Sequence, residues 1–323
     1  MSENKYLIFS GSSNPILAEK IAATLGKQLG KATLGTFSDG EIRFQSNENV
    51  RGSDVFIIQS MTSDTNFHIM ELLLMADAFK RASAKRITAV ITYYAYARQD
   101  RKDRPRVPIS AKLIADLLET AGFSRVLTID LHANQIQGFF NIPVDNLMAL
   151  PIFISYFKES HAINHHIDLK DLVVVSPDAG GVERARLFSQ ELQSDLAIAD
   201  KRRTEPGVAK IMHIIGNVHG KDTIIVDDII DSAGTLVETV NALKENGAKR
   251  IYAVCTHGLL SGKAIERIEN SPLEKVYVSD TVPLKDEKKS CGKIEVISVA
   301  NLFAEAIHSI HMETSVSKLF LVK

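Results

Sequence analysis

The residues with the clearest chemical potential lie in one short segment, IIVDDIIDSAGT, from Ile224 to Thr235. Asp227 and Asp228 follow an apolar run, and carboxylates beyond the end of a parallel strand can accept hydrogen bonds from vicinal sugar hydroxyls. The small residues that follow could surround a phosphate with their backbone N–H groups at the start of a helix: Asp231, Ser232, Ala233, Gly234 and Thr235. Each part also has a plainer interpretation, since acids often end strands in solvent and Ser-Ala-Gly-Thr can simply cap a helix. Together the parts favour a sugar-phosphate site.

A basic loop follows an aromatic stretch in the first half of the chain. Between Arg98 and Arg106, five of nine residues are Arg or Lys, enough for the loop to clamp a triphosphate. Guanidinium groups bind phosphate oxygens in a bidentate way, and an aromatic or guanidinium plane can stack on a base. The alternative is a solvated charged loop, moderated by Asp100 and Asp103. The segment alone does not decide between the two.

An acid and an imidazole lie close together at another expected strand end, in the sequence Asp130-Leu131-His132. A metal site is one use of such a pair, but Mg²⁺ prefers oxygen ligands, so the residue types alone favour a capping or hydrogen-bonding histidine. A second group of histidines lies in a polar connection and is interpreted as surface: His161, His165 and His166.

The segment from Asp200 to Gly207, DKRRTEPG, is polar, cationic and ends in Pro-Gly, which predicts a mobile loop. Cationic side chains that close over bound substrates could stabilise the charge that develops on a transferring phosphoryl group. On its own, such a segment is more often a solvated turn.

The chain as a whole alternates short β-branched runs with longer amphipathic stretches. This is the pattern of parallel βαβ units, so we predict an α/β fold. The expected strands are residues 6–9, 55–58, 87–91, 126–129, 173–175, 223–226 and 251–254. Helical spacing of apolar residues predicts helices at Ile69–Arg81 and Leu236–Glu245, the second ended by Gly247.

Two stretches of the chain resemble each other in the same order. VRGSD before the strand at 55–58 resembles VHGKD before the strand at 223–226, and AKRITAV at 84–90 resembles AKRIYAV at 248–254. Two matches in register indicate a duplication into two similar domains, residues 1–148 and 149–323, with the last helix packing back on the first. The strand that ends at Gln59 has no acidic loop. One active site per chain, built mainly on the second domain, is therefore expected.

Length and composition set further bounds. A chain of 323 residues exceeds the usual size of one hydrophobic core, which favours two domains. The net charge of −1 gives no overall field for nucleic acid or an anionic membrane, so neither is an expected partner. Two cysteines are too few for a disulfide framework, and no long apolar run indicates a signal peptide or membrane span. A reducing, cytoplasmic location is expected.

Taken in order, the motifs closely resemble those of class I ribose-phosphate pyrophosphokinases, also called phosphoribosyl pyrophosphate synthetases. They are FSDGE at 37–41, YARQDRKD at 96–103, DLHANQIQGFFNIPVDNL at 130–147, SPDAGG at 176–181, DKRR at 200–203 and VDDIIDSAGT at 226–235. The last motif on its own resembles the phosphoribosyl-pyrophosphate-binding loop of type I phosphoribosyltransferases. The resemblance implies two phosphoribosyltransferase-like domains, each a mainly parallel sheet flanked by helices, in a homohexamer whose active sites are shared between subunits.

The resemblance also implies roles for single residues. The ATP site would be formed by Arg98 and Gln99 with, from a neighbouring chain, Asp39, Gly40 and Glu41. The cofactor Mg²⁺ would contact His132 and Asp178. The catalytic cations would be Lys201 and Arg203. Ribose 5-phosphate would bind Arg203, Asp227, Asp228, Asp231, Ser232, Ala233, Gly234 and Thr235.

The reaction implied by the resemblance is transfer of the pyrophosphoryl group of MgATP to the anomeric hydroxyl of ribose 5-phosphate. The products are 5-phosphoribosyl 1-pyrophosphate, used in nucleotide biosynthesis, and AMP. One alternative is a phosphoribosyltransferase that consumes this product, and the ATP-type loop and the duplication count against it. Another is a non-catalytic regulator, which should have lost Lys201, Arg203 or His132. Regulation by ADP and inorganic phosphate is usual in the family, and by analogy an allosteric site would involve Asn49, Arg51, Ser83, Arg106, Ser315 and Ser317.

Overall fold

The computed structural model describes residues 6–160, 171–202, 211–285 and 290–320, which fall into two compact units. The first unit is built from the chain up to Met148, from Thr281–Pro283 and from the chain after Ile297. The second comprises Ala149–Asp280 and Leu284–Ile297. Helix α9 (Ala300–His311) thus belongs to the first unit. The domain limits 1–148 and 149–323 stay a prediction.

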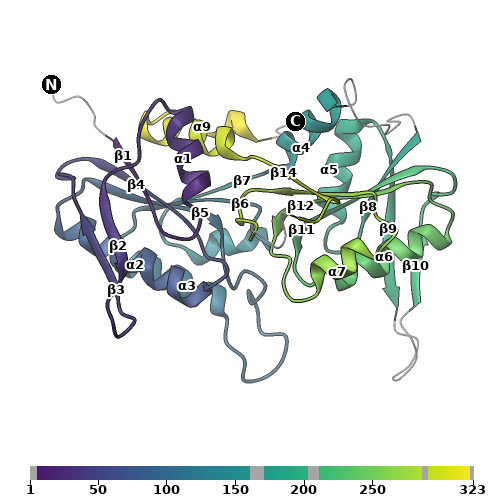
Figure 1. The fold of residues 1–323 in the computed structure, drawn as a ribbon, viewed down its shortest axis with the longest axis horizontal. Helices are drawn as coiled ribbons and strands as arrows, with labels where there is room; N and C mark the ends of the chain where they lie inside the picture. Colours follow the sequence, from purple (N-terminus) through teal and green to yellow (C-terminus); the bar gives the residue numbers. More distant parts are fainter. Residues whose placement is uncertain (1–5, 161–170, 203–210, 286–289, 321–323) are drawn as a thin grey trace. The chain divides into compact units, whose positions relative to one another are not determined.

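The first unit is built on a five-stranded parallel sheet with helices on both faces (Figure 1). Its strand order is β1-β4-β5-β6-β7, with the bounds Tyr6–Ser10, Asp54–Ser60, Arg86–Tyr93, Arg125–Ile129 and Val144–Leu147. Helices α1 (Pro15–Thr24) and α9 pack together on one face, while α2 (Thr65–Arg81) and α3 (Ser110–Ala121) cover the other. Two short 3-10 helices are η1 (Asn134–Phe139) and η3 (Ser317–Leu319).

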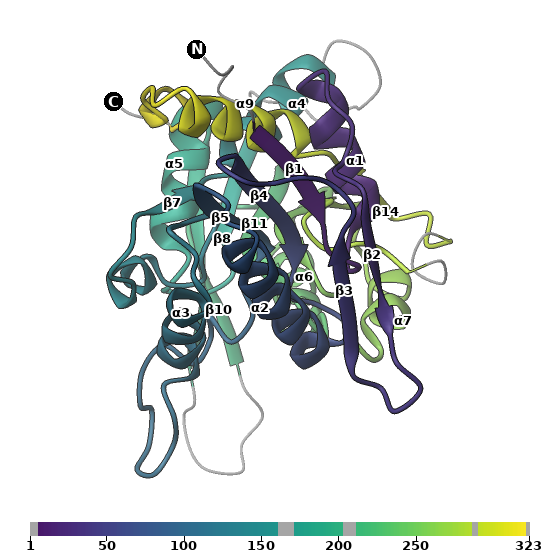
Figure 2. The same ribbon diagram turned by 90° about the vertical axis from the view of Figure 1, so that its left-hand side faces the viewer.

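An antiparallel hairpin stands beside the first sheet. It consists of β2 (Ala32–Thr36) and β3 (Ile42–Ser46), and β3 packs against α2 (Figure 2). Both strands alternate half-buried and exposed residues. One face of the hairpin is therefore left in solvent, which is typical of antiparallel strands.

The second unit is built on a seven-stranded sheet with the order β10-β9-β8-β11-β12-β13-β14. The bounds in that order are Ile211–Ile215, Asp195–Arg202, Leu172–Ser176, Asp222–Ile230, Ile251–Gly258, Lys275–Ser279 and Ile294–Ile297. All neighbours pair in parallel except β9 and β10. Helices α4 (Leu150–Ser160) and α5 (Val182–Leu192) lie on one face, and α6 (Gly234–Glu245) and α7 (Ala264–Glu269) on the other (Figure 1).

The two units repeat one topology. The order β8-β11-β12-β13-β14 follows the same path as β1-β4-β5-β6-β7, and in each unit a hairpin separates the first two of these strands in sequence. The two repeated sequence motifs form the same ion pair in each unit. Arg86 pairs with Asp54, and Arg250 pairs with Asp222, each with 2.5 Å between nitrogen and oxygen. Both aspartates are buried at the start of a central strand. The same buried ion pair thus fixes the same pair of strands twice.

All seven expected strands are present, because a strand buried on both faces reads as a continuous apolar run. Strands β4 and β12 are buried along their whole length. The sequence analysis did not predict the two hairpins or three strands near the sheet edges, namely β7, β13 and β14. It also ended one strand too early, since β11 extends four residues beyond Val226 to Ile230.

None of the helices in the described ranges is long and apolar enough to cross a membrane.

Candidate active site

The paired acids lie within strand β11 rather than after it. Asp227 pairs with Cys255 on β12, and pairing continues to Ile230, which is why the expected strand end at Val226 is wrong. Asp228 is 6% exposed, and its Oδ1 lies 3.1 Å from Nη1 of Arg184 on α5. The backbone N–H of Asp228 donates to Oδ1 of Asp227 at 2.9 Å. The two carboxylates are therefore held in fixed places at the carboxyl end of a central strand.

The electrostatics of this pair favour contact with hydroxyl donors or a cation. Burial, as the larger cause, and the neighbouring Asp228 carboxylate together raise the pKa of Asp227 to about 8, while Arg184 opposes the shift. A carboxylate that is costly to ionise in the bare protein gains most from hydroxyl donors or a cation that arrives with a ligand. Perturbed acids of this kind concentrate at functional sites.

The loop after β11 turns directly into helix α6. Ala233, the residue before the helix, adopts a left-handed conformation with φ 59° and is 4% exposed. The helix begins at Gly234, two residues before the expected start at Leu236. The first N–H groups of a helix have no partner within the helix, and here they follow a tight turn of small residues. Ser232 and Thr235 are exposed, so their hydroxyls are accessible to a ligand.

Side chains and backbone from the next connection hold this loop in place. Arg267 on α7 donates from Nη1 to the carbonyl of Ser232 at 2.7 Å. Ser261 donates from its backbone N–H to the Asp231 carbonyl at 2.9 Å and from its hydroxyl to the Asp231 carboxylate. The loop thus has a defined shape before any anion binds, which is the arrangement that phosphate loops require.

Asp178 lies in the loop between β8 and α5 and is exposed. Its Oδ1 accepts a hydrogen bond from the N–H of Gly181 at 2.9 Å, immediately before the helix begins. Its carbonyl accepts a hydrogen bond from the Ser176 hydroxyl at 2.7 Å. A carboxylate fixed in this way and open to solvent suits a metal contact as well as a helix cap. Helix α5 joins it to the acidic pair through Arg184.

His132 follows β6 in the first unit and is exposed. The turn that presents it is strained, because Asp130 has φ 42°, which residues other than glycine rarely adopt. Two hydrogen bonds hold the turn, from Asp130 N–H to the Leu147 carbonyl at 2.9 Å and from Leu131 N–H to Oδ1 of Asn146 at 3.1 Å. Strain that the surroundings maintain is often found at functional sites.

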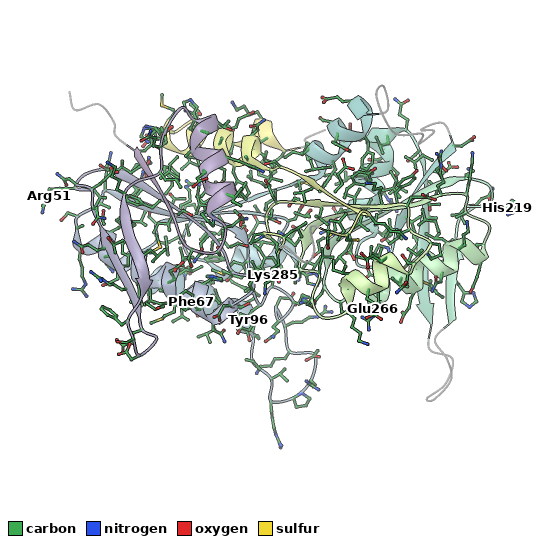
Figure 3. The ribbon with its side chains drawn as sticks, in the orientation of Figure 1. Arg51, Phe67, Tyr96, His219, Glu266 and Lys285 are labelled. Carbon is green, nitrogen blue, oxygen red and sulfur yellow. The ribbon has the colours of Figure 1, made fainter. Side chains whose placement is uncertain are left out.

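Arg98 and Gln99 follow β5 in the same unit and are exposed. Tyr96, labelled in Figure 3, has φ 59° and donates from its hydroxyl to Oδ1 of Asn66 at 2.7 Å. The Ser110 hydroxyl donates to Oε1 of Gln99 at 2.6 Å. These contacts anchor the start of the basic loop at the end of the strand.

The basic loop and the His132 segment come together in the first unit. Their parent strands β5 and β6 are neighbours, and Gln135 donates from Nε2 to Oδ2 of Asp100 at 2.8 Å. The structure therefore brings the predicted nucleotide and metal residues of this unit to one edge of its sheet.

Asp39, Gly40 and Glu41 form the tip of the β2–β3 hairpin and are exposed. Gly40 has φ 92°, and Oδ1 of Asp39 accepts a hydrogen bond from the Glu41 N–H at 3.0 Å, which gives the tip a fixed turn. Phe37 beside it is 51% exposed. An exposed aromatic residue next to two acids is suited to contact with another molecule.

The predicted cationic lid falls only partly within the described residues. Asp200, Lys201 and Arg202 belong to strand β9, so the expectation of a loop from Asp200 onward is wrong at these positions, where Lys201 pairs with Met212 on β10. Arg203 lies outside the described residues, as do His161, His165 and His166.

The sequence reading missed three residues that shape the site: Arg184, Ser261 and Arg267. Arg184 had a usable signal, since it lies six residues after Asp178 and at the third position of helix α5. Ser261 and Arg267 lie about thirty residues beyond the loop that they hold and carry no local motif. Only the pairing of β11 with β12 brings them near it.

The first unit has a counterpart of the acidic site, and there the side chains form hydrogen bonds with one another. Gln59 occupies on β4 the place of Asp227 on β11, and its Nε2 donates to Oε1 of Glu71 at 2.6 Å. Glu71 is 1% exposed and accepts hydrogen bonds from the N–H and the hydroxyl of Ser12, at 2.7 and 2.8 Å. The loop between β1 and α1 is therefore occupied by an internal carboxylate.

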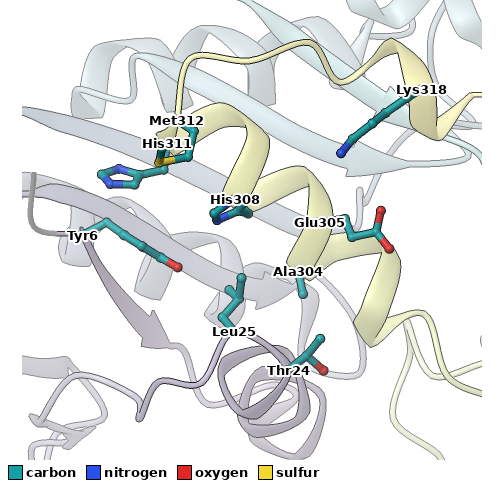
Figure 4. A pocket seen from close by; sticks show the side chains of 9 residues that line it. All are labelled: Tyr6, Thr24, Leu25, Ala304, Glu305, His308, His311, Met312 and Lys318. Carbon is teal, nitrogen blue, oxygen red and sulfur yellow. The ribbon is translucent and has the colours of Figure 1, made fainter.

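A cavity of about 470 Å³ lies between α1 and α9 in the first unit (Figure 4). It is lined by Tyr6, Thr24, Leu25, Ala304, Glu305, His308, His311, Met312 and Lys318. None of the predicted site residues belongs to this lining.

Comparison with known proteins decides the family. Residues 6–122 match a model described as the N-terminal domain of ribose phosphate pyrophosphokinase, and residues 201–321 match one described as the phosphoribosyl synthetase-associated domain. The chain belongs to the ribose-phosphate pyrophosphokinase family. The expected membership, and with it the expectation of an enzyme, is confirmed.

Relatives of the pyrophosphokinase family match the chain almost from end to end. Ribose-phosphate pyrophosphokinases of Clostridium acetobutylicum and Oceanobacillus iheyensis are 56% and 55% identical over 313 residues, 97% of this chain and 96% of each relative. The crystal structure of phosphoribosylpyrophosphate synthetase from Mycobacterium smegmatis superposes with a TM-score of 0.89 at 40% identity, covering 96% of this chain and 99% of that one. The predicted fold class, mainly parallel sheets flanked by helices, is confirmed.

Proposed function

We propose that this pyrophosphokinase transfers the pyrophosphoryl group of MgATP to the anomeric hydroxyl of ribose 5-phosphate. The products are 5-phosphoribosyl 1-pyrophosphate and AMP. The observation that carries the proposal is the acidic pair Asp227 and Asp228 followed by a pre-shaped loop at the start of α6, in a chain with 55% identity to a ribose-phosphate pyrophosphokinase. Carboxylates bind ribose hydroxyls, and the loop and helix N-terminus bind the 5-phosphate.

The sugar side of the reaction is assigned to the second unit. Asp227 and Asp228 orient the ribose ring, and Asp231 to Thr235 hold its phosphate. With the ribose ring and its phosphate bound in this way, the anomeric hydroxyl is the nucleophile. Its oxygen forms a bond to the β-phosphorus of ATP as the bond from that phosphorus to the α,β-bridging oxygen breaks. AMP leaves with the bridging oxygen, and the hydroxyl proton passes to solvent. Positioning and charge stabilisation supply most of the acceleration in such transfers.

The donor side is assigned to Arg98, Gln99 and the hairpin tip at Asp39, Gly40 and Glu41. Guanidinium and amide groups bind the nucleotide, and the tip reaches the adenine site of a neighbouring chain. Lys201 and Arg203 neutralise the charge that develops on the transferring group. The anchored start of the basic loop and the exposed hairpin tip support these roles.

Mg²⁺ is the proposed cofactor, with contacts to His132 and Asp178. Across the described ranges no three His, Cys, Asp or Glu side chains gather into a cage for a metal. This fits Mg²⁺, which is usually bound by one or two protein ligands together with substrate phosphates and water. When bound, the ion would neutralise phosphate oxygens and polarise the β-phosphorus.

We further propose a homohexamer with active sites shared between subunits, located in the cytoplasm. Exposed apolar side chains on the first unit support assembly, since Leu113 and Leu117 lie one turn apart on α3 and are 56% and 38% exposed. Regulation by ADP and inorganic phosphate stays a prediction from the family resemblance.

Phosphorus NMR of the protein with MgATP and ribose 5-phosphate tests the reaction. The expected result is AMP in equal amounts with a new sugar that carries a pyrophosphoryl group. Release of ADP, or no change in either substrate, would overturn the proposal. A separate run with 5-phosphoribosyl 1-pyrophosphate and a purine base detects the chemistry of a phosphoribosyltransferase, which would form a nucleotide and release pyrophosphate.

A further inference from the structure

Arg184 is placed to act on the sugar site without lying in the loop that was predicted to form it. It is the third residue of α5, and its guanidinium contacts the Asp228 carboxylate at 3.1 Å. The two side chains are 21% and 8% exposed, so water screens the pair less than it screens a surface pair. An arginine can hold a carboxylate in one orientation because its donors form a rigid fork.

Helix α5 links this contact to the proposed metal position. Asp178 accepts a hydrogen bond from the N–H of Gly181, the residue immediately before α5, and Arg184 lies three residues beyond that glycine. One short helical segment therefore sets both Asp178 and Asp228.

The duplicated unit supplies an internal comparison. Helix α1 follows β1 as α5 follows β8, and its third residue is Leu17, which is 1% exposed. On β4 the places of Asp227 and Asp228 are taken by Gln59 and Ser60. Where the acidic pair is absent, the arginine is replaced by a core leucine, so the cation accompanies the acids and is not required by the fold.

We propose that Arg184 is a positioning residue that orients Asp228 for the ribose hydroxyls and stabilises the negative charge of the acidic pair. The inference rests on the proposed function, because it assigns the pair to ribose 5-phosphate. The positive charge of Arg184 also opposes the rise in the pKa of Asp227 that burial and Asp228 cause. Without Arg184 the pair keeps its place in β11 but loses a cationic partner that orients one carboxylate.

Steady-state kinetics of Arg184→Met, with Arg186→Met as a matched control, tests the proposal. Arg186 is on the same helix and is exposed. Arg184→Met should raise KM for ribose 5-phosphate by about 10- to 100-fold, because a charge-assisted contact to a buried group is lost. KM for ATP should change less than about threefold. Arg184→Lys should restore part of the loss, and Arg186→Met should match the wild type.

A double-mutant cycle with Asp228→Asn separates positioning from direct contact with substrate. If Arg184 acts through Asp228, the double variant should be no worse than Asp228→Asn alone. Additive losses, or an unchanged KM for ribose 5-phosphate in a folded Arg184→Met, would overturn the proposal. Thermal unfolding of each variant identifies folding defects, and in that case Arg184→Lys in the same cycle provides the decisive comparison. A wild type that makes no AMP would instead refute the proposed function.

Discussion

At the scale of single residues, the candidate sugar site is defined by the charged side chains of Asp227, Asp228 and Arg184, which the fold itself does not require. Asp227 is half-buried beside a second carboxylate, and loss of water around it together with that negative charge raises its pKa to about 8, which costs stability. The contact from Arg184 offsets part of this cost. Residues that oppose folding yet remain in a central strand are best explained by what they bind.

Asp227→Asn should therefore stabilise the protein while weakening ribose 5-phosphate binding. Because the folded pKa lies above that of the unfolded chain, the folded state holds an extra proton between about pH 4 and pH 8, and the unfolding free energy contributed by Asp227 falls as pH rises. The variant should gain roughly 1 to 3 kcal/mol over the wild type at pH 8 and less at pH 5. Urea unfolding at both pH values measures the difference, and a gain independent of pH would contradict this origin.

Lys201→Ala tests the other side of the reaction. Loss of a cation that acts mainly in the transition state should lower kcat by about 100- to 1000-fold, with a modest change in ATP affinity. Rapid-quench measurement of AMP formation, together with ATP binding by calorimetry, gives both values. Near-normal turnover in Lys201→Ala would contradict a catalytic role for Lys201.

At the scale of elements, turns and hairpins determine where the reactive groups lie. The tip of the β2–β3 hairpin has a fixed turn and exposes Phe37. The β11–α6 loop is shaped by Ala233 in a left-handed conformation and by the contact from Arg267. Both are short connections with hydrogen bonds that fix their turns. The β11–α6 loop lies at the carboxyl end of a parallel strand, which is where parallel sheets bind ligands.

The hairpin assignment predicts complementation between two inactive variants. If Asp39 serves the active site of a neighbouring chain, Asp39→Ala and Lys201→Ala should each be nearly inactive alone. Mixed pairs would hold one site with both residues intact, so co-refolded mixtures should recover up to about a quarter of wild-type activity. Activity equal to the mean of the two parents would show that Asp39 acts within its own chain.

At the scale of the whole molecule, the two units share one sheet topology but differ in the reactive side chains at their strand ends. The ion pairs Asp54–Arg86 and Asp222–Arg250 fix equivalent strands in the two units. In the first unit His311 of α9 also contacts Asp54, with 3.0 Å between Nδ1 and Oδ2. The last helix is thereby tied to the base of the first sheet.

Asp222→Asn should lower the unfolding free energy by about 2 to 4 kcal/mol, because it removes the buried carboxylate that pairs with the half-buried Arg250 guanidinium. Asp116→Asn is the control, since Asp116 pairs with Lys112 on the surface of α3 and should cost less than about 0.5 kcal/mol. Chemical denaturation measures both changes. Equal effects would mean that the buried pair contributes little.

Much of the fold could be predicted because the central strands are apolar and because short sequence motifs recur in both units. The seven buried strands followed from β-branched runs, and the duplication followed from VRGSD and AKRITAV. The β2–β3 hairpin and the strands β7 and β14 were missed because partly exposed strands lack a continuous apolar signal. Strand β13 is buried except at its first residue, but its apolar run covers only Val276 to Val278. The end of β11 was misplaced because Asp227 carries a low strand preference that pairing with β12 overrides. Arg184 was missed because its partner is 44 residues away.

Glu71 has a consequence for how much substrate one chain can hold. Its carboxylate fills the loop before α1 with hydrogen bonds from Ser12, and Gln59 completes the closure. On β4, Gln59 and Ser60 take the places of Asp227 and Asp228, and Gln59 is already bonded to the buried Glu71 carboxylate, so these two positions have no acids to hold a sugar. Equilibrium dialysis with labelled ribose 5-phosphate should therefore saturate at one mole per mole of chain. The duplication therefore gave the chain two units with one topology but only one binding site for ribose 5-phosphate.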